Sequence, residues 1–60
     1  MKPHEFLKKA KELGWKFNRH GKEHDEYIHD TRPGVLMIPR HAKELKTGTL
    51  NQLMRTAGLK

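Results

Sequence analysis

The sequence predicts an α+β fold in which a helix, three antiparallel strands and a second helix follow one another in a single domain, residues 1–60. Three observations lead to this prediction. Apolar residues recur every three to four positions near both ends of the chain and every second position in the middle, and Pro and Gly separate these stretches. Each element then has one apolar face. Both helices can bury theirs by lying on the same face of the sheet.

The first helix is predicted to begin at Pro3 and to end before Gly14. Proline is favoured at the first helical position, where its missing N–H would have no partner. Glycine readily adopts the left-handed conformation that terminates helices. The apolar face of this helix consists of Phe6, Leu7, Ala10 and Leu13.

Three short strands are predicted after this helix. Trp15 and Phe17 alternate with polar residues, which indicates a strand with one buried face. Residues 31–34 contain adjacent Pro and Gly, a strong turn signal. The remaining boundaries are a turn at 19–22, a second strand at about 23–29 and a third strand at 35–38, closed by Pro39.

The last helix is predicted from a capping box, in which the Thr49 side chain reaches the third helical N–H and Gln52 reaches back. Gly58 followed by Leu59 fits a Schellman ending with its hydrophobic contact. The apolar stripe between them consists of Leu50, Leu53, Met54 and Ala57. Across the whole domain, the predicted core contains Phe6, Trp15, Phe17, Tyr27, Leu36, Ile38, Leu50 and Leu53.

Length and composition limit the kind of protein this can be. A chain of 60 residues buries only about 60% of the surface that it exposes when unfolded, so we expect an open working site and no bulky cofactor. The absence of cysteine excludes disulfides and thiolate zinc sites. No apolar run reaches the length of a signal or membrane-spanning segment. We therefore expect a cytoplasmic protein that does not contact membranes.

The charge indicates a polyanionic partner. Thirteen Lys and Arg against seven Asp and Glu give a net charge of +6, which is typical of nucleic-acid binding in so small a domain. The alternative is that the charge only maintains solubility. The basic residues lie in two flanks, and between them residues 23–31 hold four acids and no Lys or Arg. Histidines also occur in this acidic middle.

This order of elements on a basic chain resembles the double-stranded-RNA-binding-domain fold, and several stretches are similar to the HicA toxin family. They are Glu12-Leu13-Gly14-Trp15, Gly21, His24 with Tyr27 three residues later, Val35 to Pro39, Leu45, Gly48-Thr49-Leu50 and Ala57-Gly58-Leu59. The resemblance covers nearly the whole chain. It differs where the family commonly has Gly-Ser before its catalytic histidine, a second histidine after it, and Pro-His-Pro after the third strand. Here these positions hold Lys22-Glu23, Asp25 and Pro39-Arg40-His41.

The resemblance implies the toxin of a type II toxin–antitoxin system, an endoribonuclease (mRNA interferase) that cleaves messenger RNA. It also implies a HicB-type antitoxin that covers the catalytic face, and His24 as the catalytic residue. Cleavage without metal uses the 2′-OH of the RNA as nucleophile and needs groups that move protons, which histidine can do near neutral pH. His20 or His29 could supply a second such group. A metal site built from His20, His24, His29, Glu23 and Asp25 is disfavoured because neighbouring strand residues alternate between faces.

The residues expected to hold the RNA backbone lie around the start of the last helix. Free N–H groups and the helix dipole make such an end favourable for anions. The predicted RNA-binding residues are Lys22, Arg40, Lys43, Lys46, Gly48 and Thr49. Two alternatives stay open: a non-catalytic RNA-binding module of the same fold, and a small protein whose basic surface binds an acidic protein.

Overall fold

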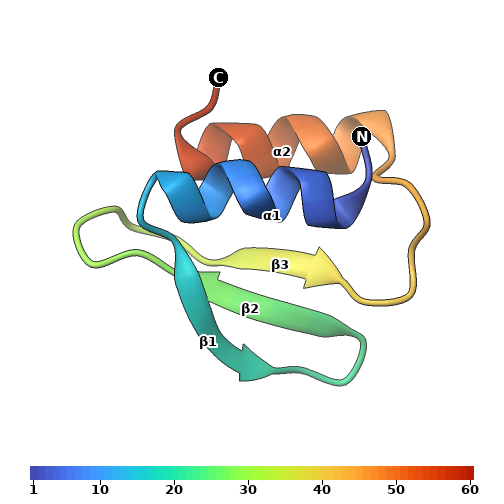
Figure 1. Cartoon of the computed structure of the whole chain (residues 1–60), viewed down its shortest axis with the longest axis horizontal. Coiled ribbons are helices and arrows are strands. Elements are labelled where there is room, and N and C mark those ends of the chain that lie inside the picture. The colour runs from blue at the N-terminus through green and yellow to red at the C-terminus, as the bar shows by residue number, and fades with distance from the viewer.

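The computed structural model describes residues 1–60 and confirms the predicted order of elements and the antiparallel sheet. Figure 1 shows both helices on one side of the three-stranded sheet, the arrangement of the double-stranded-RNA-binding-domain-like fold. The elements are α1 (Pro3–Glu12), β1 (Lys16–His20), β2 (His24–Ile28), β3 (Leu36–Pro39) and α2 (Thr47–Ala57). None of the helices is long and apolar enough to cross a membrane.

The core lies between the helices and the two strands beneath them. Its members are Phe6, Ala10, Trp15, Tyr27, Leu36, Ile38, Leu45, Leu53 and Ala57. Trp15 is 2% exposed, and its indole N–H donates a hydrogen bond of 3.1 Å to the carbonyl of Ala57. This bond satisfies the polar atom of the largest buried side chain and ties the start of the sheet to the end of α2.

The sheet has the strand order β1-β2-β3, and both pairs are antiparallel. Phe17 pairs with Tyr27, and Arg19 pairs with Glu26, so Asn18 between them is a bulge without a partner on β2. A bulge reverses the side to which the following residues point. The β1–β2 turn is also shorter than predicted, because Arg19 and His20 belong to the strand and only residues 21–23 form the turn.

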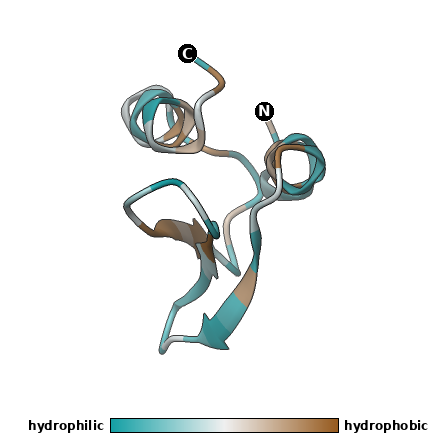
Figure 2. Ribbon diagram, turned by 90° about the vertical axis from the view of Figure 1, so that its left-hand side faces the viewer, coloured by the Kyte–Doolittle hydropathy of each residue, from teal (hydrophilic) through white to brown (hydrophobic).

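Two residues predicted to lie in the core are not fully buried: the prediction is wrong for Phe17, and Leu50 is only half-buried. Phe17 is 47% exposed, although it pairs with the buried Tyr27 and points to the same side of the sheet. Its strand extends away from the helices, as Figure 2 shows, so no helix covers it. Leu50 is half-buried because it lies in the first turn of α2, where the helix meets the edge of the sheet. The alternation of apolar residues therefore predicted the correct side of the sheet for Phe17, but not how deeply its side chain is buried.

Both predicted helix ends are confirmed. Gly14 and Gly58 have φ of 100° and 88°, values that non-glycine residues rarely adopt. The N–H groups of Trp15 and Leu59 reach back to the carbonyls of Ala10 and Met54, as in a Schellman motif.

Candidate functional site

His24 begins β2 and is half-buried. It pairs with Pro39 of β3, and the buried Tyr27 three residues later points to the opposite side. His24 therefore lies on the outward face of the sheet, away from the helices. Side chains alternate regularly between the two faces along β2, because the only bulge of this pair lies in β1. Ile28 is half-buried and lies on the same outward face as His24. The His24 side chain makes no hydrogen bond within the chain, so its ring nitrogens are free for a ligand.

The backbone that carries His24 is fixed by Gly21. The Gly21 N–H donates a 2.7 Å hydrogen bond to the His24 carbonyl, which closes the β1–β2 turn. A Cβ at position 21 would lie 2.8 Å from that carbonyl oxygen, closer than real Cβ contacts occur. Any larger residue would push the turn away from β2. Gly21 is thus a positioning residue for His24.

His24 lies between two hollows of the surface. One has a volume of about 280 Å³ and contains Lys46 and Thr49 from the start of α2, together with Met37 and Pro39 of β3. The other has a volume of about 430 Å³ and contains Lys22 from the β1–β2 turn. Neither lysine forms an ion pair. The structure therefore brings three of the predicted residues, His24, Lys46 and Thr49, to one hollow, and Lys22 to the next.

The second helix begins earlier than its predicted capping box. Lys46 is the N-cap and makes no side-chain capping bond, so Thr49 is the third helical residue and not the cap. The first backbone bond of the helix runs from the Leu50 N–H to the Lys46 carbonyl at 2.8 Å. The N–H groups of Thr47, Gly48 and Thr49 consequently have no helical acceptor. The end of the helix beside His24 can therefore accept an anion, although the capping box was wrong.

A model of the family described as the HicA toxin of bacterial toxin–antitoxin systems matches residues 3–59. The chain belongs to the HicA toxin family. Membership makes it the toxin component of a toxin–antitoxin pair, which gives it an antitoxin as partner. The comparison with curated proteins finds no match to this HicA toxin.

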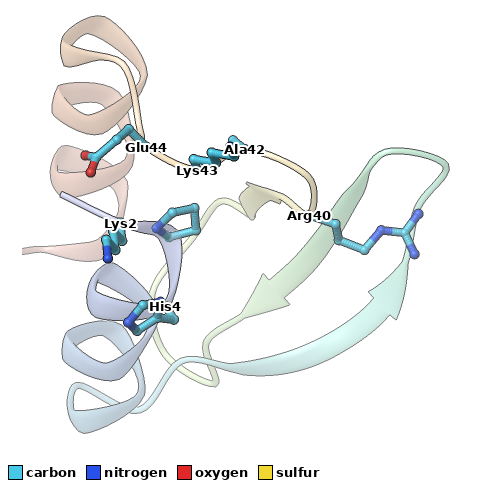
Figure 3. Close-up of a pocket in the computed structure, with 7 residues that line it drawn as sticks. Lys2, His4, Arg40, Ala42, Lys43 and Glu44 are labelled. Atoms are coloured by element: carbon cyan, nitrogen blue, oxygen red, sulfur yellow. The ribbon is translucent and has the colours of Figure 1, made fainter.

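In this HicA toxin, neither Arg40 nor Lys43 lines the two hollows beside His24. Both contribute to a separate hollow of about 640 Å³ between the start of α1 and the β3–α2 loop, shown in Figure 3 with Lys2 and His4. The Arg40 guanidinium extends from it to the β1–β2 turn, where it donates to the carbonyls of Gly21 and Lys22 at 2.7 and 2.5 Å. Arg40 therefore holds the turn that carries Lys22.

Two of the three acidic residues around His24, Asp25 and Glu26, have partners of their own. Asp25 points to the helix side of the sheet, where its carboxylate is 2.6 Å from His20 Nδ1 and 3.6 Å from Arg40 Nε. Glu26 shares the outward face with His24 and pairs with Arg19 at 3.0 Å. The hydrogen bond and charge of Glu26 raise the pKa of Arg19. The sequence analysis did not predict the His20–Asp25 pair. A hairpin turn that begins at Gly21 could have indicated it, because such a turn places these two residues opposite each other.

His29 has a structural role in this HicA toxin. Its Nε2 lies 2.7 Å from the carbonyl of Leu13, while Nδ1 accepts the N–H groups of Thr31 and Arg32 at 3.1 and 3.2 Å. Both ring nitrogens are thereby used, and the ring also meets Trp15 edge-on at 5.3 Å. His29 joins the end of α1 to the β2–β3 loop and is not available as a second proton-transfer group.

The remaining histidines are separated from His24. His20 points to the helix side of the sheet, His4 lies at the start of α1, and His41 is exposed in the β3–α2 loop. No three His, Asp or Glu side chains are arranged to hold a metal ion.

Proposed function

We propose that this HicA toxin is a metal-independent endoribonuclease that cleaves messenger RNA, with His24 as catalytic acid or base. The observation that carries the proposal is the position of His24 between two hollows that contain Lys22 and Lys46. A side chain that can transfer a proton thus lies beside cations that can hold phosphates. The same place is open to solvent and large enough for a nucleotide strand.

The chemistry needs no bound cofactor. The 2′-oxygen of the RNA attacks the adjacent phosphorus, and the bond from phosphorus to the 5′-oxygen of the next nucleotide breaks. One proton leaves the 2′-OH, one proton is delivered to the leaving 5′-oxygen, and a 2′,3′-cyclic phosphate forms. The His24 imidazole can perform one of these transfers near neutral pH. The charge that accumulates on the phosphoryl oxygens is stabilised by Lys46 and the free N–H groups of α2.

The RNA backbone is held by residues on both sides of His24. Lys46 and Thr49 contact the phosphate in the hollow at the start of α2, together with the backbone N–H of Gly48, and Lys22 contacts the RNA on the turn side. Lys43 and Arg40 belong to the separate hollow near α1, so they contact RNA only beyond the cleaved bond. Because messenger RNA is its substrate, the toxin acts in the cytoplasm.

The antitoxin partner is proposed to be of the HicB type and to cover the outward face of the sheet. That face presents His24 together with Met37, which is 45% exposed. An exposed apolar side chain next to the proposed catalytic residue gives a protein partner an apolar anchor there. Covering it would close both hollows to RNA at once.

The test compares His24→Ala with His41→Ala, which removes an exposed histidine from a loop. Purified proteins are incubated with a mixed-sequence RNA, with and without EDTA, and the product ends are analysed. We expect His24→Ala to lose activity about a hundredfold or more, the usual contribution of a general acid or base, and His41→Ala to retain it. Folding should be preserved in both, since neither imidazole makes a hydrogen bond within the chain.

Products ending in a 2′,3′-cyclic phosphate or the derived 3′-phosphate, formed equally well in EDTA, support the mechanism. Cleavage by His24→Ala at the parental rate would refute the role of His24. A parent that binds RNA but does not cut it would favour the alternative, a non-catalytic RNA-binding module. In that case Lys22-Glu23 and Asp25, the departures from the family pattern, are the first positions to revert.

A further inference from the structure

An aromatic pair on β1 has no role in the proposed cleavage. Phe17 is 47% exposed, the His20 side chain is 65% exposed, and their ring centroids are 4.8 Å apart with an interplanar angle of 59°. Both point to the helix side of the sheet, but β1 extends beyond the cover of the helices (Figure 2). All five residues of β1 are exposed, so these two rings in contact form a small aromatic surface that the core does not use.

The pair is held in place by neighbours that are themselves buried or bonded. The buried Tyr27 meets the Phe17 ring edge-on at 5.7 Å. On the other side, His20 Nδ1 is 2.6 Å from Asp25, whose carboxylate is only 20% exposed and also faces Arg40 at 3.6 Å. Rings that are already fixed lose little conformational entropy when a ligand stacks on them.

A free amide follows Phe17 directly in the chain. Asn18 is exposed, occupies the bulge between Phe17 and Arg19 without a partner on β2, and makes no side-chain hydrogen bond. Bulges commonly redirect a side chain toward a ligand. The Asn amide offers a donor and an acceptor, which match the hydrogen-bonding edge of a nucleobase.

The Asp25 carboxylate beside His20 also faces Arg40, and two further lysines nearby favour RNA over a protein as the occupant. The Lys11 ammonium lies 5.8 Å from the Tyr27 ring on one side, and Lys22 follows in the adjoining turn; neither forms an ion pair. Phe17 is the only exposed large apolar side chain of this strand, which is too little apolar surface for a protein to bury. Aromatic rings flanked by cations are the usual composition of single-strand binding sites.

We propose that Phe17 and His20 form a stacking site for one base of single-stranded RNA, with Asn18 contacting the edge of that base. This inference rests on the proposed function, because the base belongs to the strand that is cut at His24. The RNA strand passes around the β1–β2 turn, from His24 on the outward face of the sheet to Phe17 on the helix side. Lys22 lies in the turn, where the RNA passes from one face to the other. An unpaired strand is required, because a base in a duplex cannot present its ring face to Phe17.

The test measures binding of a short, mixed-sequence single-stranded RNA by fluorescence anisotropy, with all proteins carrying His24→Ala to prevent cleavage. Phe17→Leu keeps an apolar side chain and removes the ring. We expect it to weaken binding about five- to hundredfold, the range for loss of one stacked base, and to leave the salt dependence unchanged because no phosphate contact is lost. Leu13→Ala removes a comparably exposed apolar side chain, 44% exposed, from the end of α1 and should bind like the parent.

The same titrations with an abasic oligomer of equal length identify the contact. If Phe17→Leu weakens binding of the RNA but not of the abasic oligomer, the stacking site is supported. Equal weakening of both, or unchanged RNA binding by a folded Phe17→Leu protein, overturns the stacking site and leaves the endoribonuclease proposal standing. If Phe17→Leu weakens binding of the antitoxin but not of RNA, the stacking site is also overturned, because the rings then contact protein. If the parent binds no RNA, the proposed function and the stacking site fail together.

Discussion

Tyr27 and Phe17 show how differently two paired side chains can be placed. They are partners across β1 and β2, point to the same side of the sheet and have rings 5.7 Å apart. Tyr27 is 6% exposed because β2 lies beneath the helices, whereas Phe17, one strand further out, is 47% exposed. An aromatic side chain therefore contributes to the core on one strand and to a surface on the next.

Burial of Tyr27 leads to a prediction at the residue scale. Desolvation, with a smaller contribution from the charge of Asp25, raises the pKa of the Tyr27 phenol. The unfolded chain then releases this proton at lower pH than the folded chain does. The free energy of unfolding should therefore fall as the pH rises from about 10 through the folded-state pKa.

Tyr27→Phe removes the titrating group while keeping the ring. We expect little change in stability at pH 7, because the Tyr27 hydroxyl makes no hydrogen bond within the chain, and a smaller loss of stability than the parent above pH 10. Urea unfolding from pH 7 to 11 measures both. Lysine titration affects the two proteins alike, so the difference isolates Tyr27. Parallel losses in both proteins would contradict the assignment.

At the scale of elements, the start of α1 at Pro3 and both helix ends were predicted correctly, whereas the start of α2 was not. Gly14 and Gly58 end their helices with positive φ, a conformation that glycine adopts without strain, so the residue type itself marks the position. The Thr49 and Gln52 pattern has no such unique meaning, since Thr is also acceptable inside the first helical turn. The helix begins three residues earlier than predicted, at Thr47 with Lys46 as its N-cap.

The glycines at the two ends of α2 should therefore respond oppositely to alanine. Gly58→Ala places a side chain at a φ of 88° and 2.9 Å from Arg32 Cζ, so we expect a loss of about 1–2 kcal/mol. Gly48→Ala adds a methyl group to the first turn of the helix, with no atom within 4 Å, and should stabilise by up to about 1 kcal/mol. Thermal unfolding of both proteins compares the signs, and a stabilised Gly58→Ala would contradict the left-handed helix end.

At the scale of the whole molecule, the fold divides the basic residues into separate groups. Lys46 lies with His24 on one hollow, and Lys43, only three residues earlier, lies on another with Lys2 and His4. Lys22 reaches His24 from the opposite direction, through the β1–β2 turn. Closeness in sequence to the start of α2 therefore does not predict which lysines lie near His24.

Salt dependence tests this grouping. Each phosphate that a lysine neutralises releases condensed counterions, so removing Lys22 and Lys46 together should weaken RNA binding and flatten the log–log salt slope by about 1–2. The matched control is Lys8→Ala with Lys60→Ala, which removes the same charge from the exposed side of α1 and from the C-terminus. If both pairs change the slope equally, binding depends on net charge alone and not on the cations around His24.

Local patterns in the sequence determined the elements of this protein. The change in apolar spacing fixed which stretches are helix and strand, and the glycines fixed where the helices end, because these signals act between residues close in the chain. The order of elements and the short matching stretches also sufficed to indicate the HicA family, which the match over residues 3–59 shows.

Only the tertiary structure decided which side chains meet. The proximity of His24 to Lys46 and Thr49, the Asp25 link to His20 and Arg40, and the exposure of Phe17 depend on how β1, β2 and α2 are arranged in space. Alternation along a strand assigns a side of the sheet, but burial also requires a helix above that side. The two helices lie over β2 and β3 and leave β1 uncovered, and this uncovered strand supplies the aromatic surface.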